Sequence, residues 1–314
     1  MKNVEKETKK HVLNEQLENY IKKTTHKDFA KIEACRILLI TVLAIPWCIF
    51  IFIVLFLLIL CIYNQAIAGF GPILGFSIPI YIGLYLFSQW IIKIFKRNTK
   101  KIFLSKLLSY IGEFEVVNTK EDKNNLNSYI SSLKLFPPFN IFESDDMFTG
   151  KYNGIQVDIS EICIKQKEFK DSLLIFNGLL LTIPANKECD GQIIFREKGF
   201  YHIGINGLKK IKLESPEIEQ KYDIFASDNI EARKILTPAF LVRLLELSNN
   251  LKTKIFVSFE QNKINIAIQT KKDMFEMPFL SSTYNIENYK NILSENIKVL
   301  SVIDTLHLDE NIGM

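Results

Sequence analysis

Between Ile37 and Ile92 the sequence contains no Asp, Glu, Lys, Arg or His. This absence excludes a wholly water-soluble chain. A membrane-spanning helix needs about 20 apolar residues, because each residue adds roughly 1.5 Å across a hydrocarbon core of about 30 Å. The 56 residues of this run are too many for one span, and Asn64–Gln65 and Pro72 interrupt it. We therefore expect two spans, Ile37–Ile62 and Phe70–Ile92, joined as a helical hairpin.

Recognised catalytic and metal-binding motifs are also absent. The sequence has no HExxH, CxxC, GxSxG, GxxxxGK[ST] or GxGxxG pattern, so we expect no metal site and no cofactor. The acidic residues Glu143, Asp145 and Asp146 could coordinate Ca²⁺, but they are not part of a matching ligand loop. Of the four histidines, only His202 falls within the predicted sheet, where we interpret it as structural.

Cysteine is scarce, with five residues and no paired short spacing, which excludes a disulfide framework. Two of the five, Cys163 and Cys189, lie in the predicted soluble part. Unpaired cysteines there fit a reducing, cytoplasmic location.

Basic residues flank the apolar run on both sides. Of the nine basic residues before it, the five nearest are Lys22, Lys23, Lys27, Lys31 and Arg36, and the five that follow it first are Lys93, Lys96, Arg97, Lys100 and Lys101. Positive flanks stay on the cytoplasmic side, so both termini should be cytoplasmic, and the second group should contact the surface of the lipid bilayer. Residues 102–314 then hold 25 basic and 29 acidic residues, a balance that argues against nucleic-acid binding.

The periodicity of apolar residues divides the chain into four parts. We predict a cytoplasmic amphipathic leader over 1–36, the transmembrane hairpin over 37–92, a juxtamembrane helical linker over 93–138 and a soluble domain over 139–314. In the last part, alternation at Ile155, Val157 and Ile159 indicates a half-buried strand. Lys254–Phe259 and Lys263–Thr270 predict a β-hairpin. The expected fold class is α+β, with an antiparallel sheet and flanking helices.

Two helix starts are visible in this domain. Asp228 followed by Glu231 has the spacing of a capping box, and Thr237-Pro238 is typical of an N-cap and the first helical residue. The second of these helices should run over Pro238–Ser248.

Residues Phe142 to Phe275 resemble the bacterial domain-of-unknown-function 3137 family, through several motifs that occur in order. These motifs are Phe148-Thr-Gly150, Phe176-Asn-Gly178, Leu213-Glu-Ser-Pro216, Tyr222, Asp228, Glu231-Ala-Arg233, Leu236-Thr-Pro238, Phe259 and Phe275-Glu276. The chain departs from the pattern at Ile218 and Phe225, which replace aromatic or tyrosine residues. The resemblance implies a membrane-anchored protein of the bacterial inner membrane, with no established activity, cofactor or catalytic residue. It also implies a LemA-type membrane protein as partner.

The charged residues of the central motif admit two interpretations. Glu214, Asp228, Glu231 and Arg233 are either helix caps and a salt bridge, or a site for a ligand or partner. The favoured hypothesis is a non-enzymatic anchored protein that binds a protein or small ligand near the membrane surface. The alternative is a membrane-tethered enzyme that uses these four residues. A channel subunit is disfavoured, because neither span carries an ionisable residue.

Overall fold

The computed structural model describes residues 2–63, 70–117, 119–168, 171–185, 190–200, 205–270, 279–282 and 284–308. The predicted roles of Cys189 and His202 and the Phe275-Glu276 motif therefore lie outside the described residues. The chain divides into two compact units. The first comprises residues 1–106 and 275–292, and the second comprises residues 107–274 and 293–314.

Two long helices make up most of the first unit: α1 spans Lys2–Tyr63 and α2 spans Phe70–Ile111. The predicted leader and first span are thus one continuous helix. Within these helices, Ala30–Tyr63 and Gly75–Lys100 are long and apolar enough to cross a membrane. The side chains of residues 2–29 lie outside the description, so the predicted amphipathic face of the leader stays a prediction.

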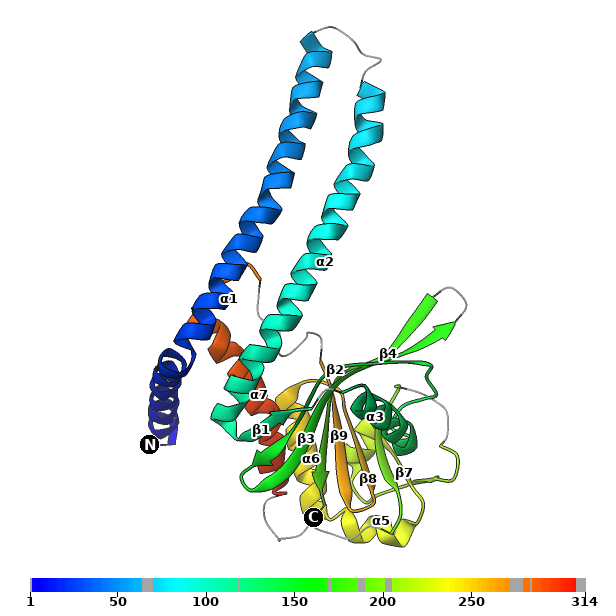
Figure 1. The fold of residues 1–314 in the computed structure, drawn as a ribbon. Helices are drawn as coiled ribbons and strands as arrows, with labels where there is room; N and C mark the ends of the chain where they lie inside the picture. Colours follow the sequence, from blue (N-terminus) through cyan, green and yellow to red (C-terminus); the bar gives the residue numbers. More distant parts are fainter. Residues whose placement is uncertain are drawn as a thin grey trace. The chain divides into compact units, whose positions relative to one another are not determined.

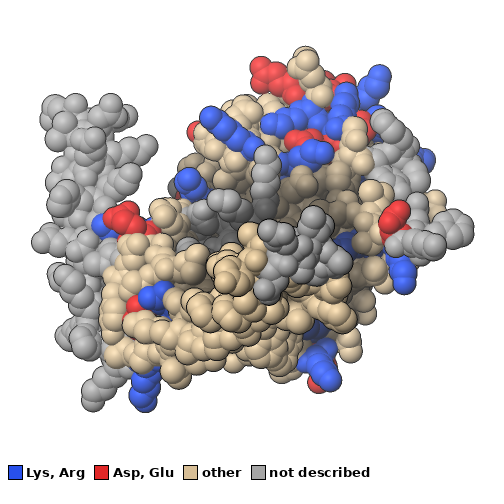
Figure 2. All heavy atoms as spheres, turned by 90° about the horizontal axis from the view of Figure 1, so that it is seen from above, with Lys and Arg blue, Asp and Glu red and all other residues tan. Residues whose placement is uncertain are grey.

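Aromatic and polar contacts join α1 to α2. The Trp47 indole N–H donates to the Ser88 hydroxyl over 3.2 Å, and the Trp47 ring packs edge-on against Tyr81 at 5.2 Å between centroids. Large apolar side chains point outward, among them Phe52, which is 70% exposed, and Phe76, which is 76% exposed. Figure 2 shows a broad tan area of uncharged residues, with charged residues mostly around its margin.

A short segment, 279–282, is fixed within the first unit by α1 and α2. The Arg36 guanidinium donates to the carbonyl oxygens of Phe279 and Leu280, both over 3.3 Å. The Ser282 hydroxyl donates to the Glu33 carboxylate over 3.0 Å. From α2, the Phe95 ring packs edge-on against Phe279.

The second unit is built on one antiparallel sheet of nine described strands, in the order β1-β2-β3-β4-β9-β8-β5-β7-β6 (Figure 1). The strands are β1 Glu113–Val116, β2 Ile141–Tyr152, β3 Ile155–Glu168, β4 Asp171–Pro184, β5 Ile193–Glu197, β6 Lys209–Ile211, β7 Tyr222–Ala226, β8 Ile255–Glu260 and β9 Lys263–Gln269. The predicted α+β class with an antiparallel sheet is confirmed, including the β8–β9 hairpin. Strand β1 was not expected, because it lies inside the segment 93–138 that was predicted to be helical.

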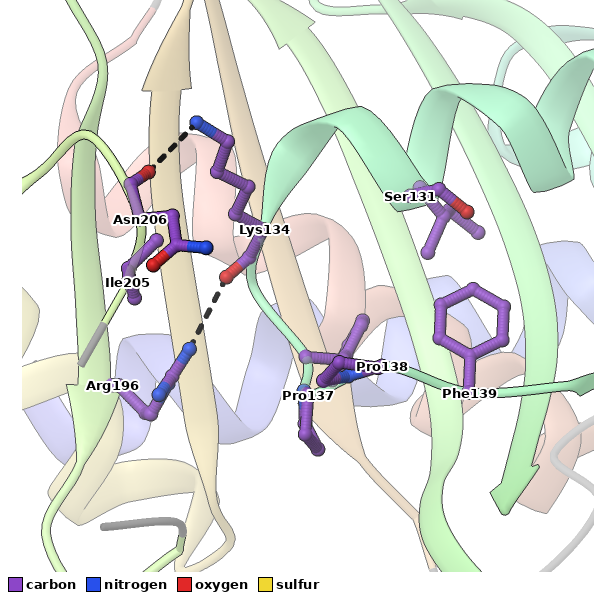
Figure 3. Close-up of a pocket in the computed structure, with 10 residues that line it drawn as sticks. Ser131, Lys134, Pro137, Pro138, Phe139, Arg196, Ile205 and Asn206 are labelled. Carbon is purple, nitrogen blue, oxygen red and sulfur yellow. Dashed lines mark hydrogen bonds between the residues drawn. The ribbon is translucent and has the colours of Figure 1, made fainter. Parts of the chain in front are cut away.

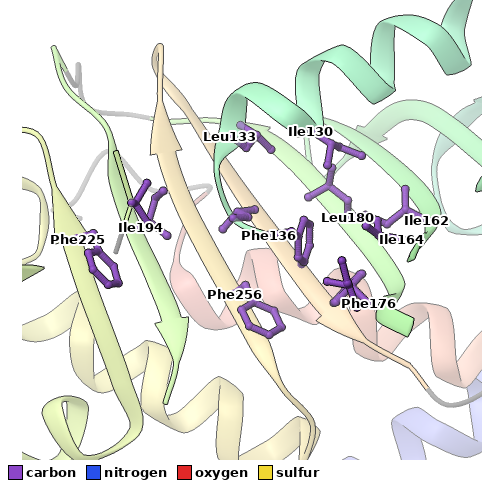
Figure 4. Close-up of a cluster of buried hydrophobic side chains, with 14 residues drawn as sticks. Ile130, Leu133, Phe136, Ile162, Ile164, Phe176, Leu180, Ile194, Phe225 and Phe256 are labelled. Atoms are coloured by element: carbon purple, nitrogen blue, oxygen red, sulfur yellow. The ribbon is translucent and has the colours of Figure 1, made fainter. Parts of the chain in front are cut away.

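The described residues form five further helices. They are α3 Lys120–Leu133, α4 Pro216–Lys221, α5 Asn229–Ile235, α6 Pro238–Leu251 and α7 Ile286–Leu306. Asp228 and Thr237 are the N-caps of α5 and α6, as predicted. Helix α3 begins with a capping box formed by Thr119 and Asp122. It covers one face of the sheet, with the other helices behind the strands (Figure 4).

Aromatic side chains fill both sides of the sheet. Under α3, the Phe136 ring lies 4.7 Å from Phe176 and 5.9 Å from Phe256, measured between centroids (Figure 4). On the opposite side, Phe240 of α6 lies 5.4 Å from Phe259 of β8. All five rings are almost fully buried, so the sheet is a central layer between two apolar cores.

Two glycines of the family motifs allow close approach of neighbouring strands. A Cβ atom on Gly178 would lie 2.1 Å from the Ile268 carbonyl oxygen, and one on Gly150 would lie 2.4 Å from the Glu113 carbonyl oxygen. Both obstacles are backbone atoms, so a side chain at either position would displace a strand.

A candidate binding pocket beside helix α3

The predicted charged cluster separates into local structural contacts. One Asp228 carboxylate oxygen accepts the backbone N–H groups of Ile230 and Glu231, at 2.6 and 3.4 Å, so this side chain caps α5. The Glu231 carboxylate pairs with Lys234 one turn later. No capping bond from the Glu231 side chain back to Asp228 is formed, because that carboxylate faces Lys234.

Among the four predicted residues, Arg233 and Glu214 form the one described contact between two side chains. The Arg233 guanidinium lies 3.4 Å from the Glu214 carboxylate and also donates to the Lys212 carbonyl oxygen over 3.4 Å. The Glu214 side chain is 92% exposed, so this ion pair lies in water and contributes little to stability. The geometry agrees with the interpretation as caps and a salt bridge.

The basic residues that follow the second apolar run differ in exposure. Lys93 and Arg97 are exposed on α2, whereas Lys100 is only 8% exposed. The side chain of Lys101 lies outside the described residues. Lys96 is partly exposed, and contact of these residues with lipid headgroups stays a prediction.

The acidic residues ahead of Phe148 do not converge. Glu143 pairs with Lys165 across the β2–β3 ladder at 3.1 Å, and Asp146 is buried. Within the described part of the chain, no three His, Cys, Asp or Glu side chains lie together as metal ligands.

A pocket of about 490 Å³ lies beside the C-terminal end of α3 (Figure 3). Apolar side chains form most of its wall, and cationic and amide side chains stand on one side. The lining residues are Ile130, Ser131, Lys134, Phe136, Pro137, Pro138, Phe139, Arg196, Ile205 and Asn206. The pocket thus offers an apolar wall next to positive charge.

Arg196 provides the buried charge of this pocket. Its side chain comes from β5 and is 4% exposed, and its guanidinium donates to the Lys134 carbonyl oxygen over 3.2 Å (Figure 3). The guanidinium carbon also lies 5.6 Å from the centre of the Phe225 ring. Burial lowers the pKa of Arg196, and the neighbouring Asp223 carboxylate opposes that change.

Arg196 lies where the C-terminal carbonyl groups of α3 require hydrogen-bond donors. The last carbonyl groups of a helix have no partner within the helix, and cations are favourable there. Gln192, just before β5, donates its side-chain amide to the Ser132 and Leu133 carbonyl oxygens at 3.3 and 3.0 Å. Together with Arg196, Gln192 binds the end of α3 to the sheet.

Lys134 supplies a second cation at the mouth of the pocket. Its backbone has φ of 53°, the left-handed conformation that ends α3. Its ammonium group donates to the Asn206 carbonyl oxygen over 3.2 Å, which links the helix end to the segment before β6 (Figure 3). Both cations therefore adjoin the same cavity.

A smaller cavity of about 370 Å³ lies beside the other end of α3. The Tyr129 and Thr182 hydroxyl groups both donate to the side-chain carbonyl oxygen of the fully buried Asn265, at 2.8 and 2.9 Å. On the neighbouring strands, the Thr149 hydroxyl donates to Asp158 over 2.6 Å. These residues stand opposite one another across four adjacent strands, so their side chains share one face.

The residues of the α3 pocket were missed by the sequence analysis. Lys134, Arg196 and Asn206 are far apart in the chain and belong to no motif. The one available signal was Arg196, which directly follows the apolar run Ile193–Phe195. A charge in a buried strand needs a partner, but the sequence does not identify it.

Comparison with known proteins gives one match to a family. Residues 174–308 match the family described as "Protein of unknown function (DUF3137)". No curated protein matches the chain. Among solved structures, the crystal structure of the mycobacterial trehalose monomycolate transport factor A, TtfA, is 12% identical in sequence, with a TM-score of 0.33. That comparison covers 66% of this chain and 93% of the other, and at this TM-score it supports no conclusion. The predicted resemblance to the DUF3137 family is therefore confirmed over residues 174–308.

Proposed function

We propose that this chain is a membrane-anchored binding protein whose sheet domain receives an anionic small ligand or an acidic group of a protein partner. Anchoring is supported by α1 and α2, whose apolar side chains point outward over two lengths sufficient to cross a bilayer. The contact of Trp47 with Ser88 and Tyr81 supports a paired hairpin.

The observation that carries the binding role is the pocket beside α3. Arg196 and Lys134 place positive charge next to an apolar wall that includes Phe136 and Phe139. An occupant that matches this chemistry has one carboxylate, sulfonate or phosphate group bonded to an aromatic or aliphatic body. The charged residues of the predicted cluster form a helix cap and exposed ion pairs, so the pocket carries the binding proposal.

Titration with 2-naphthoate, followed by calorimetry on the full chain in detergent, tests this role. The neutral 2-naphthylmethanol is the control ligand. We expect 2-naphthoate to bind more tightly than 2-naphthylmethanol. Lys134→Met should lower the affinity for 2-naphthoate about tenfold, because a hydrogen bond to a charged group contributes roughly 1.5–3 kcal/mol. Lys167→Met, which lies outside the pocket, should leave the affinity for 2-naphthoate unchanged. Equal binding of the two ligands, or no effect of Lys134→Met, would show that the pocket does not select anions.

We further propose that the membrane is the bacterial inner membrane, with both termini in the cytoplasm and a LemA-type protein as partner. The flanking positive charges support the cytoplasmic placement of the termini. Reporter enzymes fused after Met314, one active in the periplasm and one in the cytoplasm, test it. Signal from the periplasmic reporter would mean one span or a reversed hairpin.

A further inference from the structure

Strands β3 and β4 extend past their neighbours as a two-stranded ribbon (Figure 1, bright green). In the described residues, the pairing of β2 with β3 reaches Lys165 and the pairing of β9 with β4 reaches Gly178. The two strands continue to pair with each other as far as Glu168 and Asp171. A two-stranded ribbon is only marginally stable in water, so a further covering would stabilise its end.

The end of the ribbon carries two exposed leucines. Leu173 is 57% exposed and Leu174 is 53% exposed, whereas Ile175 and Phe176, the next residues of β4, are buried in the sheet. Successive residues of a strand point to opposite faces. The two leucines therefore place one exposed apolar side chain on each face of the ribbon, opposite Lys165 and Gln166 of β3.

Apolar side chains on both faces indicate the kind of covering. A protein partner that docks on a sheet covers one face, but a surrounding apolar medium covers both. Lys167 is exposed on the opposite strand, directly across from Ser172. A lysine beside a short apolar end suits the boundary between headgroups and acyl chains, where the stem lies among apolar groups and the ammonium reaches anionic headgroups.

The sheet is joined to α2 by a single residue. Helix α2 ends at Ile111 and β1 begins at Glu113, so only Gly112 separates them.

We propose that the end of the β3–β4 ribbon, through Leu173 and Leu174, inserts into the interfacial layer of the membrane that anchors the chain. This inference rests on the anchoring part of the proposed function and adds a second, reversible contact with lipid. The contact would hold the sheet domain at the membrane at two places, the end of α2 and the ribbon.

Hydrogen exchange followed by mass spectrometry tests the contact. The full chain is compared in detergent micelles and in nanodiscs of phosphatidylcholine with phosphatidylglycerol. In nanodiscs, the amides of the ribbon end should exchange about tenfold more slowly, because insertion excludes water. The double variant Leu173→Ser/Leu174→Ser should lose this protection and keep that of the buried part of β4. Val242→Ser, a change at an exposed apolar position of α6, is the matched control.

The outcomes separate the two proposals. If the chain enters nanodiscs but the ribbon exchanges equally in discs and micelles, the ribbon contact is wrong and the anchoring stands. If the chain does not enter nanodiscs, the anchoring is wrong and the ribbon contact with it. Protection that rises with protein concentration in micelles would identify a second copy of the chain as the covering and overturn the lipid contact.

Discussion

The Arg36 guanidinium lies 2.6 Å from the Glu33 carboxylate, and each side chain is only 11% exposed. The pair forms two hydrogen bonds and also binds the backbone of segment 279–282. An ion pair shielded from water is costly to break from one side, because the remaining charge loses its partner. The attachment of segment 279–282 therefore depends on Arg36 and Glu33 of α1.

Removing the arginine should release this segment. We expect Arg36→Ala to destabilise its attachment by about 3 kcal/mol, since Glu33 would remain as a poorly solvated charge. Chymotrypsin cleavage after Phe279 or Leu280 measures the effect, and the variant should be cut faster than the unaltered chain. Lys31→Ala, an exposed change on the same helix, should not alter the rate. Equal cleavage of all three proteins would contradict the role of the pair.

Tyr222 gives the sheet domain a defined sensitivity to alkali. The residue is 2% exposed, and burial raises the pKa of its hydroxyl from the usual 10 to about 12. Because the raised pKa belongs to the folded state, the stabilisation is complete below pH 10 and is lost as the pH rises towards 12. The full effect is about 3 kcal/mol for a shift of this size.

The variant Tyr222→Phe isolates this contribution. Its thermal unfolding midpoint, followed by near-ultraviolet circular dichroism, should fall less between pH 10 and pH 12 than that of the unaltered chain. The change Tyr284→Phe serves as control, because Tyr284 is 49% exposed. Parallel pH profiles for the unaltered chain and Tyr222→Phe would show that another group governs the alkaline transition.

Phe176 is the central ring of the core under α3. It is fully buried and contacts both Phe136 and Phe256. We expect Phe176→Ala to lower the free energy of unfolding by about 3–5 kcal/mol, from lost burial and the cavity left behind. Denaturant titration measures the change. Val242→Ala, at a position that is 63% exposed, should have little effect. A similar loss in both variants would mean that the core is not organised around this ring.

Gly178 tests the close approach of β4 and β9. The change Gly178→Ala should destabilise the sheet by about 1–3 kcal/mol, because the added methyl group meets the Ile268 carbonyl oxygen. The thermal midpoint provides the measurement. Gly83→Ala is the matched control, since a Cβ atom there meets nothing within 4 Å. An unchanged midpoint for Gly178→Ala would require the two strands to be farther apart.

Local chemistry explains which elements were predictable. Asp228 and Thr237 cap helices through bonds to residues two or three positions later, so the pattern is visible in a short stretch of sequence. The β8–β9 hairpin is equally local. Strand β1 has only four residues and exists because it pairs with β2 more than thirty residues later, a contact that periodicity does not reveal.

The candidate pocket was not predictable for the same reason. It depends on Lys134 at the end of α3 meeting Arg196 of β5 and Asn206 near β6. The predicted charged cluster was attractive because its residues are close in sequence. Closeness of that kind is also what caps and i, i+3 ion pairs require, and Asp228 and Glu231 form such local contacts, whereas Glu214 pairs with the more distant Arg233.

The strand order has a consequence for how the chain acquires its structure during synthesis. Strands β8 and β9 stand between β4 and β5, so they join a half made of β1–β4 to a half made of β5–β7. Both halves leave the ribosome before the strands that connect them. At roughly 5–20 residues per second, the interval from Pro184 to Gln269 lasts about 4–17 s. During that time the inner edge of β4, and that of β5 once Ile193–Glu197 has been made, lack their final partners, so this interval is when the nascent chain most needs protection from aggregation.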